Sequence, residues 1–209
     1  MPLAVDQVIF YFLVLIVSLS VHEAAHAWSA DLLGDPTASR LGRVTLNPMA
    51  HIDPIGTVLF PLIAITTGAP VIGWAKPVPV GVRYLGPQWR QKFMLIAAAG
   101  PISNLVLALL VSALLHLGAA RTGTALDLTS SSLLYKALTL NVTLAVFNMI
   151  PVPPLDGGNV LAGLVSGKAA NVLDRVRPYG FIVLYALLLT GVVSTVLGLF
   201  AAPIVSWLD

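Results

Sequence analysis

Long apolar stretches alternate with short polar connectors along the whole chain. The stretches cover residues 8–33, 52–74, 93–117, 133–150 and 179–207. Most are long enough for the roughly 20 residues that a helix needs to cross a bilayer, and the last is long enough for one tilted helix or a tight pair. This pattern predicts an all-α polytopic membrane protein with about five to six transmembrane segments. No internal repeat or shift of composition divides the chain, so residues 1–209 are expected to form a single domain.

The second stretch, residues 52–74, differs from the others because it is rich in helix breakers. It contains Pro54, Gly56, Pro61, Gly68, Pro70 and Gly73. Such a density predicts a re-entrant or broken element rather than a straight span. In the connector before it, the alternation of "RLGRVTL" (40–46) predicts a short strand-like region.

Composition supports a membrane protein and excludes several other classes. Of the 209 residues, 57% are hydrophobic and only 10% are charged, against about a quarter charged in a typical soluble domain. The net charge of +2 gives no argument for a nucleic-acid partner, and the absence of cysteine excludes disulfides and thiol chemistry. The first apolar stretch has no basic segment before it, so we interpret it as a retained helix rather than a cleaved signal.

The basic residues predict an orientation. If 52–74 dips into the membrane and returns, one side carries nine Lys and Arg residues and the other side carries Arg121 alone, with Lys136 left out because it lies inside a span. A full crossing would weaken this asymmetry. By the positive-inside rule the re-entrant topology places the N-terminus outside and the first helix running inward. The expected location is therefore the cell membrane, in multi-pass topology.

The candidate chemistry lies in "HEAAH" (22–26), inside the first apolar stretch. His22 and His26 are four residues apart, so a helix places them on one face, where they can bind one Zn²⁺. Glu23 is the single glutamate of the chain and can accept a proton from water that the zinc acidifies. The alternative is an amphipathic helix with satisfied histidines. That alternative would place three ionisable groups within five residues at membrane depth, where burying each of them costs free energy.

A catalytic zinc needs a third protein ligand, and the residues leave two candidates. His116 lies near the outer end of its stretch, at the wrong depth, and Asp53, Asp127 and Asp174 lie in or beside polar loops where they are expected to be solvated. His51, expected near the inner surface, is an interfacial or gating residue and the weaker ligand candidate.

Asp156, in "NMIPVPPLDGGNVL", is the favoured candidate. Prolines end the preceding helix there, and Gly157–Gly158 allow close backbone approach. The alternative is an Asp that caps a helix beginning near Asn159. Zn²⁺ with ionised Asp156 and Glu23 gives a neutral cluster, which favours the metal site. A helix rise of 1.5 Å per residue puts His22 about 16 Å from Leu33, so the site is expected below the inner surface and reached from the cytoplasmic side.

Three sequence blocks carry a resemblance to a known family. "HEAAH" (22–26), "AAAGPISN" (97–104) and "NMIPVPPLDGG" (148–158) occur in the order found in the site-2 protease family of intramembrane zinc metalloproteases. The sequence resembles the compact subgroup without PDZ or CBS domains. The resemblance implies that Asp156 is the third zinc ligand and that Asn148 positions substrate or stabilises the oxyanion. Asn104 matches the second block and is assigned a packing role. Residues 52–74 are longer than the strand-rich loop of minimal members.

The leading functional hypothesis is an intramembrane zinc endopeptidase, with one Zn²⁺ per chain, that cleaves membrane-anchored proteins in or near their transmembrane segments. Residues 78–80 are a candidate strand edge for an extended substrate, and changes there are expected to impair cleavage while sparing zinc. A zinc or divalent-metal transporter is the alternative, since intramembrane His and acidic residues also mark ion paths. The lack of a second polar cluster disfavours it. An inactive scaffold is a third hypothesis, and the retained Glu23 argues against it.

Overall fold

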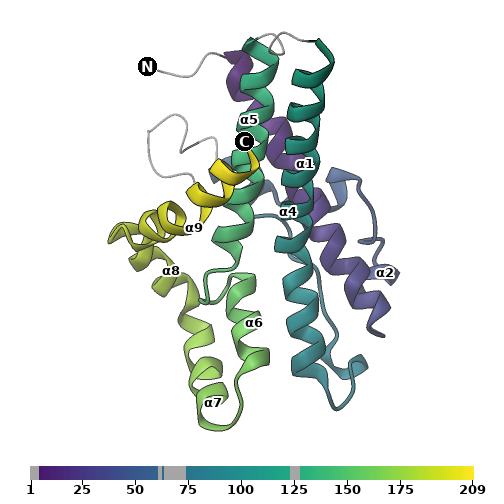
Figure 1. Ribbon diagram of the computed structural model, residues 1–209. Helices are drawn as coiled ribbons and strands as arrows, with labels where there is room; N and C mark the ends of the chain where they lie inside the picture. The colour runs from purple at the N-terminus through teal and green to yellow at the C-terminus, as the bar shows by residue number, and fades with distance from the viewer. Residues whose placement is uncertain (1–4, 61–62, 64–73, 123–127) are drawn as a thin grey trace.

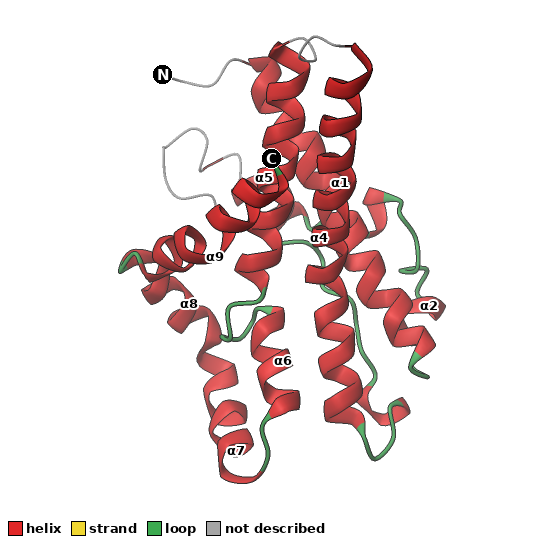
Figure 2. Ribbon diagram, viewed as in Figure 1, coloured by secondary structure: helices red, strands yellow, loops and turns green. Residues whose placement is uncertain are grey.

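The computed structural model describes residues 5–60, 63, 74–122 and 128–209, and this part of the chain is helical with no strand (Figures 1 and 2). The main helices are α1 (Val5–Leu32), α4 (Trp89–Thr122), α5 (Leu128–Asn148), α6 (Asp156–Leu164), α7 (Gly167–Val176), α8 (Gly180–Leu189) and α9 (Val192–Leu208). Shorter helical segments are α2 (Thr37–Arg40), 3-10 turns at Pro48–Ala50, Val82–Tyr84 and Arg177–Tyr179, and a π-helical segment at Pro54–Leu59.

Helices α1, α4 and α5 pack side by side, and α5 with the adjoining parts of α1 and α4 forms the upper part of the molecule in Figure 1. Ala108, Leu138 and Val142 are fully buried where α4 meets α5, and α9 closes this core with Ala201 and Val205. Helix α6 packs against the other half of α4. Gly163 lets the two backbones approach, since a Cβ there would lie 2.4 Å from the Cβ of Met94. The long helix α4 is therefore the scaffold on which α1 and α6 meet.

Two helices in the described part of the chain are long and apolar enough to cross a membrane, within Ile9–Leu32 and Trp89–Leu117. Helix α1 carries an exposed stripe of Ile9, Leu13 and Val17, each more than half accessible. An apolar stripe left on the outside of the fold is typical of a helix in contact with lipid. The predicted spans at 8–33 and 93–117 are thus confirmed as apolar helices.

The other predicted spans have different outcomes. Most of the stretch 133–150 lies in α5, which ends at Asn148 and is not among the described helices that are long and apolar enough to cross a membrane. The stretch 179–207 is a pair, because the helical segment Gly167–Leu189 and α9 bend by 78° at Gly191, whose φ of 75° favours glycine. A count of five to six crossings is therefore not confirmed. The described residues show two, or three if the bent pair is one span.

The polar connector after α1 does not form the predicted strand-like region. Gly34, with φ of 101°, ends α1, and the amide of Asp35 donates to the carbonyl of Ala30. Residues 37–40 then form α2, and turns follow. The alternation in 40–46 was a misleading signal because Arg43 is buried inside this connector rather than facing solvent. Of the predicted re-entrant element, Pro54–Leu59 is π-helical, while 61–62 and 64–73 lie outside the described residues.

The segment 74–81 contains no regular element and is fastened to this connector by hydrogen bonds. The amide of Lys76 donates to the carbonyl of His51 at 2.8 Å, and Arg43 donates to the carbonyl of Lys76. The amide of Gly81 donates to the fully buried carboxylate of Asp35 at 2.6 Å. These bonds hold the segment close to the C-terminal end of α1.

Candidate metal centre

Two histidines of α1 form the first part of the site. His22 and His26 are one helical turn apart, and both are buried, at 5% and 8% exposure. Their Nε2 atoms are 3.0 Å apart and their rings stand nearly perpendicular, with an interplanar angle of 86°. Two unprotonated nitrogens at this distance repel each other unless a cation lies between them. The arrangement therefore favours a bound metal ion.

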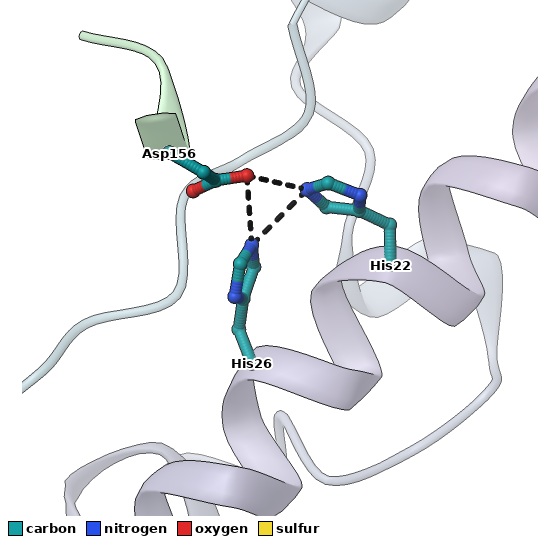
Figure 3. Close-up of side chains that lie close together, drawn as sticks. All are labelled: His22, His26 and Asp156. Atoms are coloured by element: carbon teal, nitrogen blue, oxygen red, sulfur yellow. Dashed lines mark hydrogen bonds and ion pairs between the residues drawn. The ribbon is translucent and has the colours of Figure 1, made fainter. Parts of the chain in front are cut away.

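The third donor comes from the first residue of α6. Oδ2 of Asp156 lies 3.1 Å from Nε2 of His22 and 3.4 Å from Nε2 of His26, and Figure 3 shows it facing both rings. Glycines place it there: a Cβ on Gly157 would lie 2.3 Å from the carbonyl oxygen of Met149, and one on Gly158 would lie 2.6 Å from the nitrogen of Pro153. The predicted close approach is confirmed. The helix begins at Asp156 itself, three residues earlier than the capping alternative requires.

The three donor atoms fit zinc. Zinc bonds of 2.0–2.1 Å in a tetrahedron imply donor separations of about 3.3 Å, and the separations here are 3.0, 3.1 and 3.4 Å. Two imidazole nitrogens and one carboxylate oxygen are also a donor set that zinc accepts, and they leave a fourth position open. His22, His26 and Asp156 are the group of metal donors found among the described residues.

Both histidines are oriented by hydrogen bonds to α4. Nδ1 of His22 lies 2.6 Å from Oδ1 of Asn104, and Nδ1 of His26 lies 2.7 Å from the carbonyl oxygen of Ile96. Because a carbonyl oxygen only accepts, each Nδ1 carries the proton and each Nε2 keeps its lone pair for the metal. Asn104 is itself held by Asn141 of α5, whose Oδ1 accepts from its Nδ2 at 3.1 Å.

A glycine between these two partners makes room for the rings. A Cβ on Gly100 would lie 2.4 Å from Nε2 of His26 and 2.5 Å from Nε2 of His22. Ile96, Gly100 and Asn104 are spaced by four, so one face of α4 supplies a carbonyl, a gap and an amide to the metal site. Asn104 is buried, as its predicted packing role requires, and in addition accepts a hydrogen bond from His22. The spacing of Gly and Asn in "GPISN" was the available signal.

Glu23 lies next to His22 on α1 and is buried at 9% exposure. The other predicted catalytic residue, Asn148, is near the end of α5 and donates its side-chain amide to the carbonyl of Leu144 at 3.0 Å. It is not one of the grouped metal donors. The role of Asn148 in catalysis stays a prediction.

The remaining candidate ligands are used elsewhere. His51 is buried and borders a small pocket that is also lined by residues of α1, and it is not part of the donor group. Nδ1 of His116 donates to the carbonyl of Ser112. Asp53 caps the segment Pro54–Leu59, and Asp174 pairs with Arg90 at 2.7 Å on the surface. Asp127 lies outside the described residues.

Comparison with known proteins agrees with this geometry. The sequence profile of peptidase family M50 matches residues 10–120 and 116–191, which include all three donors. The chain belongs to peptidase family M50. It is 37% identical over 191 residues to a Bacillus subtilis protein, covering 90% of this chain and 84% of that one, and 34% identical over 178 residues to a Mycolicibacterium smegmatis protein, covering 84% and 64%.

The Bacillus subtilis protein is named "Putative zinc metalloprotease YwhC", and the Mycolicibacterium smegmatis protein is named "Putative zinc metalloprotease Rip2". A Mycobacterium tuberculosis Rip2 is 28% identical over 174 residues, covering 83% of this chain and 64% of that protein. This chain thus spans just under two thirds of the Rip2 proteins. No solved structure matches it. The M50 chain is a zinc metalloprotease of the site-2 protease family, as the resemblance implied, and Zn²⁺ is its cofactor.

Proposed function

We propose that this M50 protein hydrolyses peptide bonds in or near transmembrane segments of membrane-anchored protein substrates. The observation that carries the proposal is the position of the metal site. Two of its three donors and Glu23 lie on α1, within the apolar span Ile9–Leu32. A protease built for soluble substrates has no reason to bury its metal site in an apolar helix, where ionisable groups are costly.

The chain's own residues divide the reaction between them. When bound, zinc acidifies water and polarises the scissile carbonyl. His22, His26 and Asp156 would hold the metal and leave its fourth position open. Glu23 accepts the proton from the attacking water and returns it to the leaving amine. Asn104 and the carbonyl of Ile96 keep both imidazoles in the tautomer that this requires.

The substrate has to unwind before it can be cut, because a transmembrane helix keeps its peptide groups in backbone hydrogen bonds. An unwound segment needs new partners for these groups, and an exposed backbone edge supplies them. Residues 78–80 lie in the fastened segment 74–81, and prolines at 77 and 79 leave Val78 and Val80 as the backbone donors. We propose this edge as the substrate contact, with the protein in the cell membrane and the site reached from the cytoplasmic side.

Transport of zinc is not supported. An ion path needs successive polar sites across the membrane. The described residues provide one group of metal donors, and the family comparison points to hydrolysis.

The test compares wild type with Glu23→Gln, both purified in detergent. Bound zinc is counted, and cleavage of a panel of single-span substrates is followed on a gel. The variant is expected to keep stoichiometric zinc and to lose cleavage by at least about a hundredfold, because it keeps the ligands and loses the base. His26→Ala serves as the control that loses both. A wild type that cleaves no substrate in the panel would contradict the proposal.

A further inference from the structure

Asn141 is a buried amide on α5, a helix that contributes no member to the donor group of His22, His26 and Asp156. Its side chain is 3% exposed, and that of Asn104, its partner on α4, is 1% exposed. Burying an amide costs free energy unless its polar atoms find partners. These two side chains bond to each other, to the ring of His22 and to two backbone carbonyls.

The direction of the Asn141 amide is fixed by the backbone of its own helix. Its Nδ2 donates to the carbonyl of Ala137, one turn earlier, at 3.0 Å. A carbonyl only accepts, so the reversed amide would bring two acceptors together. The oxygen Oδ1 of Asn141 is therefore the atom that faces Asn104, and an amide oxygen can only accept there.

This acceptor fixes the direction of the Asn104 amide in turn. Nδ2 of Asn104 donates to Oδ1 of Asn141 at 3.1 Å, and more weakly to the carbonyl of Ser18 on α1 at 3.4 Å. Reversing this amide would place its oxygen against both acceptors. Nδ2 consequently faces them, and Oδ1 of Asn104 faces Nδ1 of His22 at 2.6 Å.

The series of bonds ends at a metal donor. Because Oδ1 of Asn104 accepts, Nδ1 of His22 carries the proton and Nε2 keeps the lone pair that a metal requires. A reversed Asn104 would instead present a donor to Nδ1 of His22. The neutral ring would then carry its proton on Nε2, in the position that the metal needs. A backbone carbonyl of α5 thus acts on His22 through two amides.

We propose that Asn141 is a positioning residue of the metal site, which holds His22 in its zinc-binding tautomer by fixing the direction of Asn104. The alternative is an amide that only joins α4 to α5, since interhelical bonds of this kind are common between membrane helices. The two roles differ in one respect. A positioning residue acts on the metal through Asn104, whereas a packing residue stabilises the helix pair whether or not Asn104 is present. The inference concerns zinc binding and does not depend on the proposed substrate.

The first measurement is zinc affinity in detergent, by competition with a chromophoric chelator. Asn141→Leu has a similar volume but no acceptor, and we expect it to bind zinc about tenfold more weakly than wild type. Asn141→Asp keeps an oxygen for Asn104 and is expected to retain most of the affinity. The matched control is Ser112→Ala, which removes another buried side-chain bond of α4, to the carbonyl of Leu208, and should leave zinc affinity unchanged.

A double-mutant cycle separates positioning from packing. Asn141→Leu is combined with Asn104→Ala, which removes the amide through which Asn141 is proposed to act. The double variant is expected to bind zinc as tightly as Asn104→Ala alone, because the effect of Asn141 has no remaining route to His22. Independent packing contributions would instead multiply the two fold-losses.

Each outcome decides for or against the proposal. Wild-type affinity in Asn141→Leu, losses that multiply in the double variant, or an Asn141→Asp variant as weak as Asn141→Leu would each overturn it. A loss that Asn141→Asp recovers and that vanishes in the Asn104→Ala background supports it. Circular dichroism checks that each variant is folded, and Asn141→Ala replaces Asn141→Leu in the cycle if the latter is not. None of these measurements uses cleavage, so a negative result leaves the proposed proteolysis intact.

Discussion

At the scale of single residues, the metal site depends on atoms that never touch the metal. Each ligand histidine donates its Nδ1 proton to α4, at 2.6 Å to Asn104 and 2.7 Å to the carbonyl of Ile96. One of these partners is a side chain and the other is backbone. Mutation can therefore test the orientation of His22 directly, whereas the orientation of His26 is built into the helix. Gly100 lies between them and contributes only space.

Replacing Gly100 by Ala is expected to weaken zinc binding by at least about tenfold, because the new Cβ overlaps the Nε2 atoms of both histidines. Zinc affinity can be measured by competition with a chromophoric chelator. The matched control is Gly198→Ala in α9, where a Cβ meets nothing within 4 Å and zinc binding should not change. Equal affinities in the two variants would contradict the close approach.

Replacing Asn104 by Ala is expected to reduce zinc affinity by roughly 10- to 100-fold, because His22 loses the acceptor that fixes its tautomer. Asn104→Asp keeps an oxygen at that position and should retain more zinc than Asn104→Ala. The same competition assay measures both variants. If Asn104→Ala binds zinc as tightly as wild type, Asn104 has only a packing role.

At the scale of elements, three segments far apart in the sequence converge on the site. Helix α1 supplies two metal donors and carries Glu23, the proposed base, while α4 supplies the orienting face and the start of α6 supplies the third donor. Segment 74–81 follows the connector and is fastened by Asp35 and by the backbone of His51. Buried polar groups are used to hold this segment in place, which is consistent with its proposed role as the edge that binds a substrate strand.

Val78→Pro removes one of the two backbone donors between residues 77 and 80 and is expected to lower cleavage by about tenfold or more while bound zinc stays stoichiometric. Val78→Ala keeps the donor and removes only the side chain, so its loss should be smaller. Cleavage rates and zinc content on the same samples decide between them. Cleavage by Val78→Pro at the wild-type rate would rule the edge out.

At the scale of the whole molecule, none of the apolar clusters formed by the described residues contains a metal donor, although Ile96 of one cluster accepts from His26 and Leu155 of another precedes Asp156. The clusters formed by α4, α5 and α9, and by the 150–155 turn with α8 and α9, contain no metal donor. The outside of α1 exposes large aliphatic side chains, which require lipid or detergent around them. The fold is therefore expected to hold together without the metal.

Removing zinc with a chelator is expected to abolish cleavage and to leave the far-ultraviolet circular dichroism of the detergent-solubilised protein nearly unchanged. Adding zinc back should restore activity, because the apolar cores keep the helices in place. Metal analysis before and after confirms the removal. Loss of helical signal together with the metal would show that zinc is needed for folding, as it is in small zinc domains.

The sequence by itself determined what depends on local spacing and composition. Four features are consequences of short-range geometry. They are the helix across 22–26, the pair of ligands one turn apart, the long apolar helices and the glycines that follow Asp156. The metal chemistry was predictable for the same reason, since His-Glu-x-x-His brings ligands and base together within a single helix.

Only the tertiary structure decided which distant residues share a volume. The packing of α4 and α6 against α1 brings Asp156, and not His51, within reach of the two histidines. The same packing places Asn104 where it accepts a hydrogen bond from His22. That His51 borders a pocket beside α1 also follows only from the tertiary structure. The alternation at 40–46 misled because burial of Arg43 in a folded connector has no local signature. An apolar run in the sequence likewise shows only how hydrophobic and how long a segment is. Whether a run crosses the membrane, bends or packs on its neighbours depends on contacts between elements, and these are made only in the folded chain.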